Sequence, residues 1–110
     1  MNRTHNNGEL RIEQVGQIVE LKGWVAKTRN LGGLIFIDLR DRYGMTQLVV
    51  NPETAKPEVL EAANKVRNEY VVAVKGEVTE RQSKNPNMPT GDIEVALNEL
   101  TIISEAEMTP

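Results

Sequence analysis

The 110-residue chain contains no cysteine and a single histidine. It therefore offers neither a disulfide framework nor the ligand set of a zinc site, and we expect it to bind no metal. No apolar run approaches the roughly 20 residues that span a bilayer, and the N-terminal segment lacks the apolar centre of a signal peptide. These absences predict a soluble, cytoplasmic protein that does not engage membranes.

Catalytic signatures are missing as well. The sequence has no Gly-rich phosphate loop and no Ser-His-Asp or Cys-His combination. We expect no catalytic residue in these 110 residues.

The length suits a single domain, residues 1–110, and a hydrophobic content of 39% is enough for one small core. The net charge of -3 hides an asymmetry. Residues 1–50 carry seven Lys or Arg against five Asp or Glu, whereas residues 51–110 carry six against eleven. The basic first half could neutralise a few phosphates, but the chain lacks a strong overall positive charge. We therefore expect selective binding to a polyanion rather than non-specific electrostatic binding.

Hydrophobic periodicity predicts a helical turn near 11–15, ended by Gly16, then strands over 18–28, 34–41, 45–50, 70–79 and from 93 onward, with a helix from Pro57 to near Asn68. In the last strand, Leu100 and Ile102 fall out of the alternation set by the preceding apolar residues. This change of parity predicts a bulge near Asn98.

The order of three strands, one helix and two strands is that of the OB-fold. The predicted fold class is therefore all-β with one helix: a five-stranded Greek-key barrel with the helix between strands 3 and 4. An open α+β sandwich would show the same periodicity.

Phe36, the only phenylalanine, falls on the opposite strand face from the aliphatic residues Ile35, Ile37 and Leu39. An outward aromatic with Lys27 and Arg29 upstream has the composition of a stacking surface for an unpaired base. The alternative is that Phe36 belongs to the core, as strand phenylalanines commonly do.

Other polar and aromatic residues near this strand have structural interpretations. Trp24 is expected to cover an open barrel end or to support the stacking surface. Asp38, Arg40, Asp41 and Arg42 are expected to form a cross-strand charge network at the barrel rim.

Four segments give a specific resemblance: the opening RTH…GEL, the GWV, the block LGGLIFIDLRDR and the block PTGDIEV. Together they closely resemble the N-terminal anticodon-binding OB-fold domain of bacterial-type aspartyl-tRNA synthetase, over residues 3–110. The resemblance implies a tRNA partner whose anticodon has a G-like first base, a central U and a C.

By position in the matched blocks, the resemblance implies that Phe36 stacks on the central base and that Gln47 hydrogen-bonds it. Glu94 matches the carboxylate that reads the first base. Arg29 matches a basic contact to the anticodon stem-loop, which Lys27 reinforces.

Four more positions follow from the resemblance. Arg81, Asn85 and Asn87 lie in the loop that approaches the third base, although loop length varies there. Leu31 resembles the residue of enzymes restricted to aspartate tRNA. The chain departs from the family pattern at Thr28, which interrupts a segment commonly richer in Arg, and at Asn30, which replaces an acid.

The resemblance further implies a longer parent enzyme, a homodimeric class II aspartate-tRNA ligase that uses ATP and Mg²⁺. Residues 108–110 are then the start of a linker, and the 110 residues are an excised domain, expected to be monomeric and non-catalytic. Three alternatives stay open. They are a free-standing OB module for single-stranded nucleic acid, the corresponding domain of an asparagine or lysine tRNA ligase, and an OB domain that acts in protein assembly.

Overall fold

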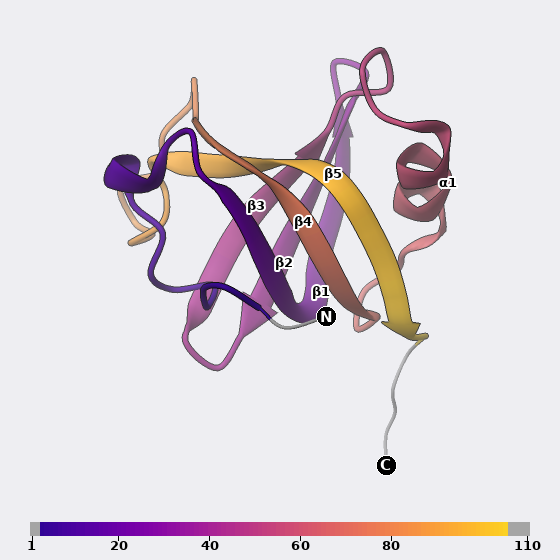
Figure 1. The fold of residues 1–110 in the computed structure, drawn as a ribbon, viewed down its shortest axis with the longest axis horizontal. Helices are drawn as coiled ribbons and strands as arrows, with labels where there is room; N and C mark the ends of the chain where they lie inside the picture. The colour runs from indigo at the N-terminus through magenta and orange to yellow at the C-terminus, as the bar shows by residue number, and fades with distance from the viewer. Residues whose placement is uncertain (1–2, 106–110) are drawn as a thin grey trace.

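The computed structural model describes residues 3–105. Its elements are the 3-10 helix η1 (Ile12–Gln14), strands β1 (Ile18–Leu31), β2 (Leu34–Asp41) and β3 (Gly44–Val50), helix α1 (Pro57–Lys65), and strands β4 (Val71–Glu80) and β5 (Ile93–Ser104). The five strands form a closed barrel in the order β1-β2-β3-β5-β4 (Figure 1). The predicted fold class is confirmed, including the helix between strands 3 and 4. The proposed linker residues 108–110 lie outside the described residues.

Strand β1 closes the barrel because it pairs with two neighbours in succession. Its first half, from Ile18 to Trp24, is antiparallel to β4, and its second half, from Trp24 to Leu31, is antiparallel to β2. A bulge between Val25 and Lys27 lies near the start of the half that pairs with β2. Such an extra residue increases local twist and lets one strand bend from one partner to the next.

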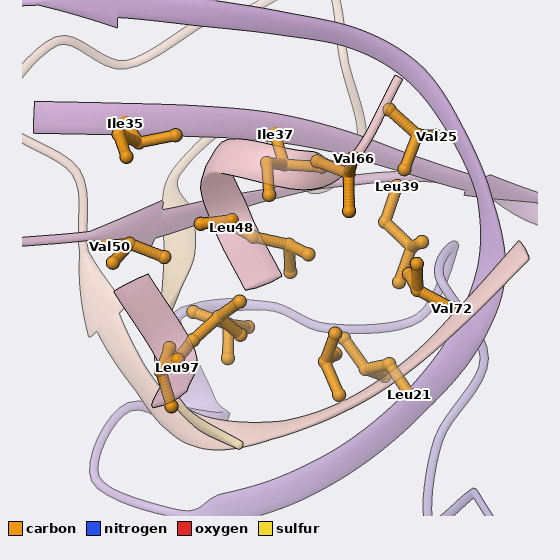
Figure 2. Packing of buried hydrophobic residues seen from close by; sticks show 14 of the residues in the cluster. Leu21, Val25, Ile35, Ile37, Leu39, Leu48, Val50, Val66, Val72 and Leu97 are labelled. Atoms are coloured by element: carbon orange, nitrogen blue, oxygen red, sulfur yellow. The ribbon is translucent and has the colours of Figure 1, made fainter. Parts of the chain in front are cut away.

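The barrel interior is filled by aliphatic side chains that alternate along the strands, as the period-2 pattern predicts (Figure 2). Ile37, Leu39 and Leu48 are fully buried. The remaining core members come from every strand, from α1 and from the N-terminal segment: Leu10, Val19, Leu21, Val25, Ile35, Val50, Val59, Ala63, Val66, Val72, Val74, Val78, Ile93, Val95 and Leu97.

Helix α1 begins with Pro57 at its first turn, where the missing N–H of proline costs nothing. The predicted end near Asn68 is wrong, because the helix ends at Lys65. Val66 adopts an extended conformation and its side chain is buried, and the Arg67 guanidinium donates to the carbonyls of Asn64, Lys65 and Val66. Packing of Val66 into the core and this side-chain cap outweigh the helical pattern that runs further along the sequence.

The N-terminal segment is held to the barrel by Asn7, which is fully buried. Its side-chain Nδ2 donates to the Lys22 carbonyl at 3.1 Å, and its backbone N–H donates to Asp41 Oδ2 at 2.9 Å. Thr46 Oγ1 donates to the Asn7 carbonyl at 2.9 Å. The RTH…GEL segment therefore ties β1, the β2–β3 turn and β3 together, and its role in this structure is to anchor the chain.

Strand β5 contains the predicted bulge. Glu99 pairs with Lys75 and Leu97 pairs with Gly76, so Asn98 has no partner in the ladder with β4. Gly76 is required at this point, since a Cβ there would lie 2.3 Å from the carbonyl oxygen of Ala96. Within residues 3–105, no helix is long and apolar enough to cross a membrane.

Candidate functional site

An open cleft of about 830 Å³ lies over the outer face of β2 and β3. Its floor comes from β1, β2 and β3, its wall from the β4–β5 connection, and one edge from β5. The lining residues are Arg29, Leu31, Gly32, Leu34, Phe36, Asp38, Met45, Gln47, Glu80, Arg81, Gln82, Ser83, Asn85, Met88 and Glu94. All four residues of the main sequence prediction, Arg29, Phe36, Gln47 and Glu94, therefore line one surface.

Phe36 is half-buried and faces the cleft, while its neighbours Ile35 and Ile37 face the core. The parity prediction is confirmed, and the core interpretation of this ring is wrong. Across the sheet, Phe36 pairs with Arg29 on β1 and with Val49 on β3. An aromatic ring is thus presented at the floor of the cleft from the middle of the sheet.

A chain of hydrogen bonds crosses the cleft floor beside Phe36. The Arg29 guanidinium donates from Nη1 to Asp38 Oδ2 at 2.8 Å and from Nη2 to Asp38 Oδ1 at 3.2 Å. Its Nη2 also donates to Gln47 Oε1 at 2.9 Å, and Gln47 Nε2 donates to Glu94 Oε1 at 2.8 Å. We call these four residues the Asp38–Arg29–Gln47–Glu94 network.

The expectation that Asp38 belongs to a charge network at the barrel rim is wrong. Asp38 pairs with Arg29 in the cleft, because its register on β2 places it between Lys27 of β1 and Gln47 of β3. Asp41 does hold the β2–β3 turn, since its carboxylate accepts hydrogen bonds from the N–H groups of Tyr43 and Gly44.

The other two members of the expected network, Arg40 and Arg42, make no ion pair within the described chain, 3–105. Arg40 lies 3.8 Å from the Met45 sulfur, and Arg42 stacks on the Tyr43 ring at 5.5 Å. Asp41 alone of the four therefore fulfils the expectation of a structural role at this end of the barrel.

The wall of the cleft is a compact turn in the β4–β5 connection. The backbone N–H of Asn85 donates to the Gly91 carbonyl at 2.9 Å, and that of Gly91 donates to Met88 at 3.0 Å. A Cβ at Gly91 would lie 1.8 Å from the Asn85 carbonyl oxygen, so only glycine fits there. Thr90 Oγ1 donates to the Met45 carbonyl, which ties this turn to β3.

Of the five further residues predicted to contact tRNA, the structure places three in the cleft lining and two outside it. Leu31, Arg81 and Asn85 line the cleft, whereas Lys27 and Asn87 are exposed outside its lining. Trp24 also lies outside the lining and is 37% exposed.

Cleft residues that the sequence did not single out include Leu34, Met45 and Met88. Leu34 shares the outward parity of Phe36 and could have been found by the same argument. Met45 lies on β3 and shares the parity of Gln47, so alternation could have found it as well. Met88 reaches the cleft from the β4–β5 loop, for which strand alternation gives no signal.

Charge in the cleft is mixed and slightly negative. Its lining contains two basic side chains, Arg29 and Arg81, against three acidic ones, Asp38, Glu80 and Glu94. At the loop, a hydrogen bond from exposed Lys84 to Glu80 raises the pKa of the lysine above its usual range. Residues 3–105 contain no group of three or more His, Asp or Glu side chains that could hold a metal ion. The cleft is therefore suited to donor-rich, flat ligands that insert by stacking.

Comparison with known proteins gives a family match. A family model described as an OB-fold nucleic acid binding domain, the tRNA anti-codon family, matches residues 19–103. The chain is 56% identical over its whole length to an aspartate-tRNA ligase of Lactococcus lactis subsp. cremoris strain MG1363 and covers 19% of that protein. It thus spans about a fifth of the length of the curated relatives that it matches.

Two solved structures resemble the fold. An asparaginyl-tRNA synthetase from Pyrococcus horikoshii superposes with a TM-score of 0.79 at 31% identity, covering 96% of this chain and 24% of that one. The OBody AM2EP06, solved bound to hen egg-white lysozyme, superposes with a TM-score of 0.85 at 23% identity, covering 96% and 97%. The second likeness concerns the fold alone.

Proposed function

The chain belongs to the OB-fold nucleic acid binding domain family, and on that premise we propose that it reads the anticodon loop of an aspartate tRNA. The observation that carries this proposal is Phe36, an aromatic ring at the floor of an open cleft, set directly beside the Asp38–Arg29–Gln47–Glu94 network. Stacking and edge-reading groups therefore stand side by side, which is the arrangement that a splayed, unpaired base requires.

Phe36 supplies affinity in this proposal. Base-on-ring stacking contributes about 1–3 kcal/mol per base and is tolerant of base identity. The ring is held from behind by the sheet and flanked by Arg29, so it is presented without a rearrangement of the strand. Phe36 is the proposed platform for the central base.

Gln47 and Glu94 supply discrimination. Gln47 is only 6% exposed, and each end of its amide already has one protein partner. Oε1 retains a lone pair and Nε2 retains a hydrogen, which together match the N–H and carbonyl of uracil. Glu94 uses Oε1 for Gln47 and has Oε2 available to accept from the donors of guanine.

Phosphate contacts are few in this proposal. Lys27 lies on the same face as Arg29 and, within the described chain, forms no ion pair. Arg81 lies in the cleft wall, and Asn85 beside it is the proposed contact to the third base. A plot of log affinity against log salt should therefore have a shallow slope, corresponding to about two to four neutralised phosphates.

The whole protein is proposed to be an aspartate-tRNA ligase of class II, a cytoplasmic homodimer that uses ATP and Mg²⁺ outside these 110 residues. The 31% identity to an asparaginyl-tRNA synthetase structure supports a second candidate, a domain that reads the asparagine anticodon. Exposed Leu31 at the cleft mouth, whose type resembles that of aspartate-restricted enzymes, favours the first candidate.

The test is a titration of the 110-residue chain with anticodon stem-loops of about 17 nucleotides. That length holds one loop and a short stem. One loop carries GUC, and others change one anticodon base at a time, including a third-base U for the asparagine reading. Preference for GUC supports the proposal, preference for GUU indicates the second candidate, and binding without base preference indicates a general single-strand module. Failure to bind any loop contradicts the proposal.

A further inference from the structure

Asp38 carries no role in the proposed base contacts, yet it is among the most deeply placed acids of the chain. Asp38 is 9% exposed, and both of its carboxylate oxygens accept hydrogen bonds from the Arg29 guanidinium. Paired bonds between a carboxylate and guanidinium fix the plane and direction of the arginine side chain. Asp38 therefore decides where the Arg29 donors point.

One of these donors points at Gln47. Arg29 has only N–H donors, so its Nη2 requires the oxygen end of the Gln47 amide, and the contact is made to Oε1 at 2.9 Å. An ionised Glu94 has only acceptors, so it requires the nitrogen end, and Nε2 donates to it at 2.8 Å. Arg29 and Glu94 therefore favour the same orientation of the Gln47 amide.

The Gln47 amide can discriminate between bases only if the positions of its donor and acceptor atoms are fixed. If Gln47 could flip, its free lone pair and its free N–H would exchange places, and the pattern shown to a base would reverse. Arg29 blocks that flip from one side and Glu94 from the other. Asp38 in turn holds Arg29. It lies opposite Gln47 in the β2–β3 ladder, but within residues 3–105 its carboxylate makes no hydrogen bond to the side chain of Gln47 or Glu94.

The same bonds remove Arg29 from the set of phosphate contacts. Three hydrogen bonds engage its guanidinium inside the protein, and its charge is balanced by the adjacent Asp38. With Glu94 included, the network carries a formal charge of -1, so it does not attract a phosphate. In this interpretation Arg29 orients Gln47, whereas the resemblance implied that it contacts the anticodon stem-loop directly.

We propose that Asp38 is a positioning residue for base specificity, which acts by clamping Arg29 so that Arg29 fixes the orientation of the Gln47 amide. The proposal rests on the proposed function and extends it to a residue that touches no nucleic acid. Specificity at the central base then depends on Asp38, while the electrostatic attraction to the phosphate backbone does not.

The binding test compares Asp38→Asn with the unmodified chain on stem-loops that differ at the central anticodon base, at several salt concentrations. Asp38→Asn should lower the preference for uracil by about tenfold, the worth of one good base contact, and leave the salt slope unchanged. Lys27→Ala is the matched control, because Lys27 pairs with Asp38 in the ladder and shares its face. Lys27→Ala should reduce the salt slope by about one and preserve the base preference.

A second readout needs no RNA. The Gln47 side-chain amide protons should be protected from exchange in the unmodified chain and should lose protection in Asp38→Asn, as seen in proton–nitrogen spectra. If Asp38→Asn fails to fold, Asp38→Glu and Arg29→Lys replace it, since both keep the charges and change the fork geometry.

The outcomes separate the two proposals. If the unmodified chain binds without base preference, the proposed function fails, and the amide spectra still decide whether Asp38 orients Gln47. Unchanged amide protection, or unchanged base preference, in a folded Asp38 variant overturns the inference. A reduced salt slope in Arg29→Gln, which removes the positive charge, also overturns it, because Arg29 would then be a phosphate contact.

Discussion

Phe36 and Arg29 lie directly opposite each other in the β1–β2 ladder, and the Arg29 guanidinium hydrogen-bonds to Asp38 and Gln47 on the same face of the sheet. The ring is consequently bordered by a polar network on one side and by the open cleft on the other. A base that stacks on Phe36 is brought within reach of donors and acceptors whose directions the protein has already set. Affinity and discrimination should therefore be separable by mutation.

Removing the ring tests affinity. Phe36→Ala should weaken binding by about 1–3 kcal/mol whichever base is central, because a ring stacks on every base. Phe36→Leu keeps apolar contact without the aromatic face and should recover only part of the loss. Affinities come from titrations, and thermal melts check folding. Loss of the fold in Phe36→Ala would contradict the outward placement of the ring.

Removing the amide tests discrimination. Gln47→Ala should cost about 1–3 kcal/mol for uracil and less for other central bases, so the preference at that position flattens. Glu94→Gln should relax the preference for guanine at the first position, since an amide accepts through one atom only. Both variants are measured against stem-loops changed one base at a time. Equal losses on every loop would show that these side chains support the site without reading bases.

The wall of the cleft depends on Gly91. Gly91→Ala places a methyl group against the Asn85 carbonyl, so the turn must open, and we expect a stability loss of about 1–3 kcal/mol from overpacking. Because Asn85 then moves, preference at the third anticodon base should fall more than preference at the central base. Asn87→Ala, in the same loop but outside the cleft lining, is the control and should leave stability nearly unchanged. Selective loss at the central base instead would argue against the proposed place of the third base.

The N-terminal anchor should affect stability without affecting recognition. Asn7→Ala removes a buried donor from the Lys22 carbonyl and should lower the free energy of unfolding by about 1–3 kcal/mol. Asn64→Ala, on the exposed face of α1, should change it by less than about 0.5 kcal/mol. Urea unfolding gives both values. A change in base preference in folded Asn7→Ala would contradict the anchoring role assigned to the segment.

Strand patterns predicted much of this fold because the sheet has one face in the core. The alternation around Ile35, Ile37 and Leu39 placed Phe36 outward, and the broken parity after Leu97 located the bulge. These are local properties of the chain, and the structure confirms them. The end of α1 was missed because it depends on Val66 burial and on Arg67, which act through tertiary packing.

The site was predicted only in part for the same reason. The resemblance placed Phe36, Gln47 and Glu94 at one surface, but no pattern indicated that Asp38 faces Arg29. That pairing depends on the bulge between Val25 and Lys27, which shifts the register of β1 against β2 by one residue. A one-residue shift exchanges the two faces of a strand, so the partner of Arg29 could not be deduced without the ladder.

The most direct test of the central claim is photo-crosslinking of the 110-residue chain to a GUC stem-loop with 5-bromouridine at the central anticodon position. The cross-linked peptide is then identified by mass spectrometry. The exposed or half-buried aromatic residues lie in different segments of the chain, so the peptide identifies which ring holds the base. They are Trp24 on β1, Phe36 on β2, Tyr43 in the β2–β3 turn and Tyr70 just before β4. We predict a single major adduct on Phe36 that disappears in Phe36→Leu, and an adduct centred on Trp24 or Tyr43 would contradict the account.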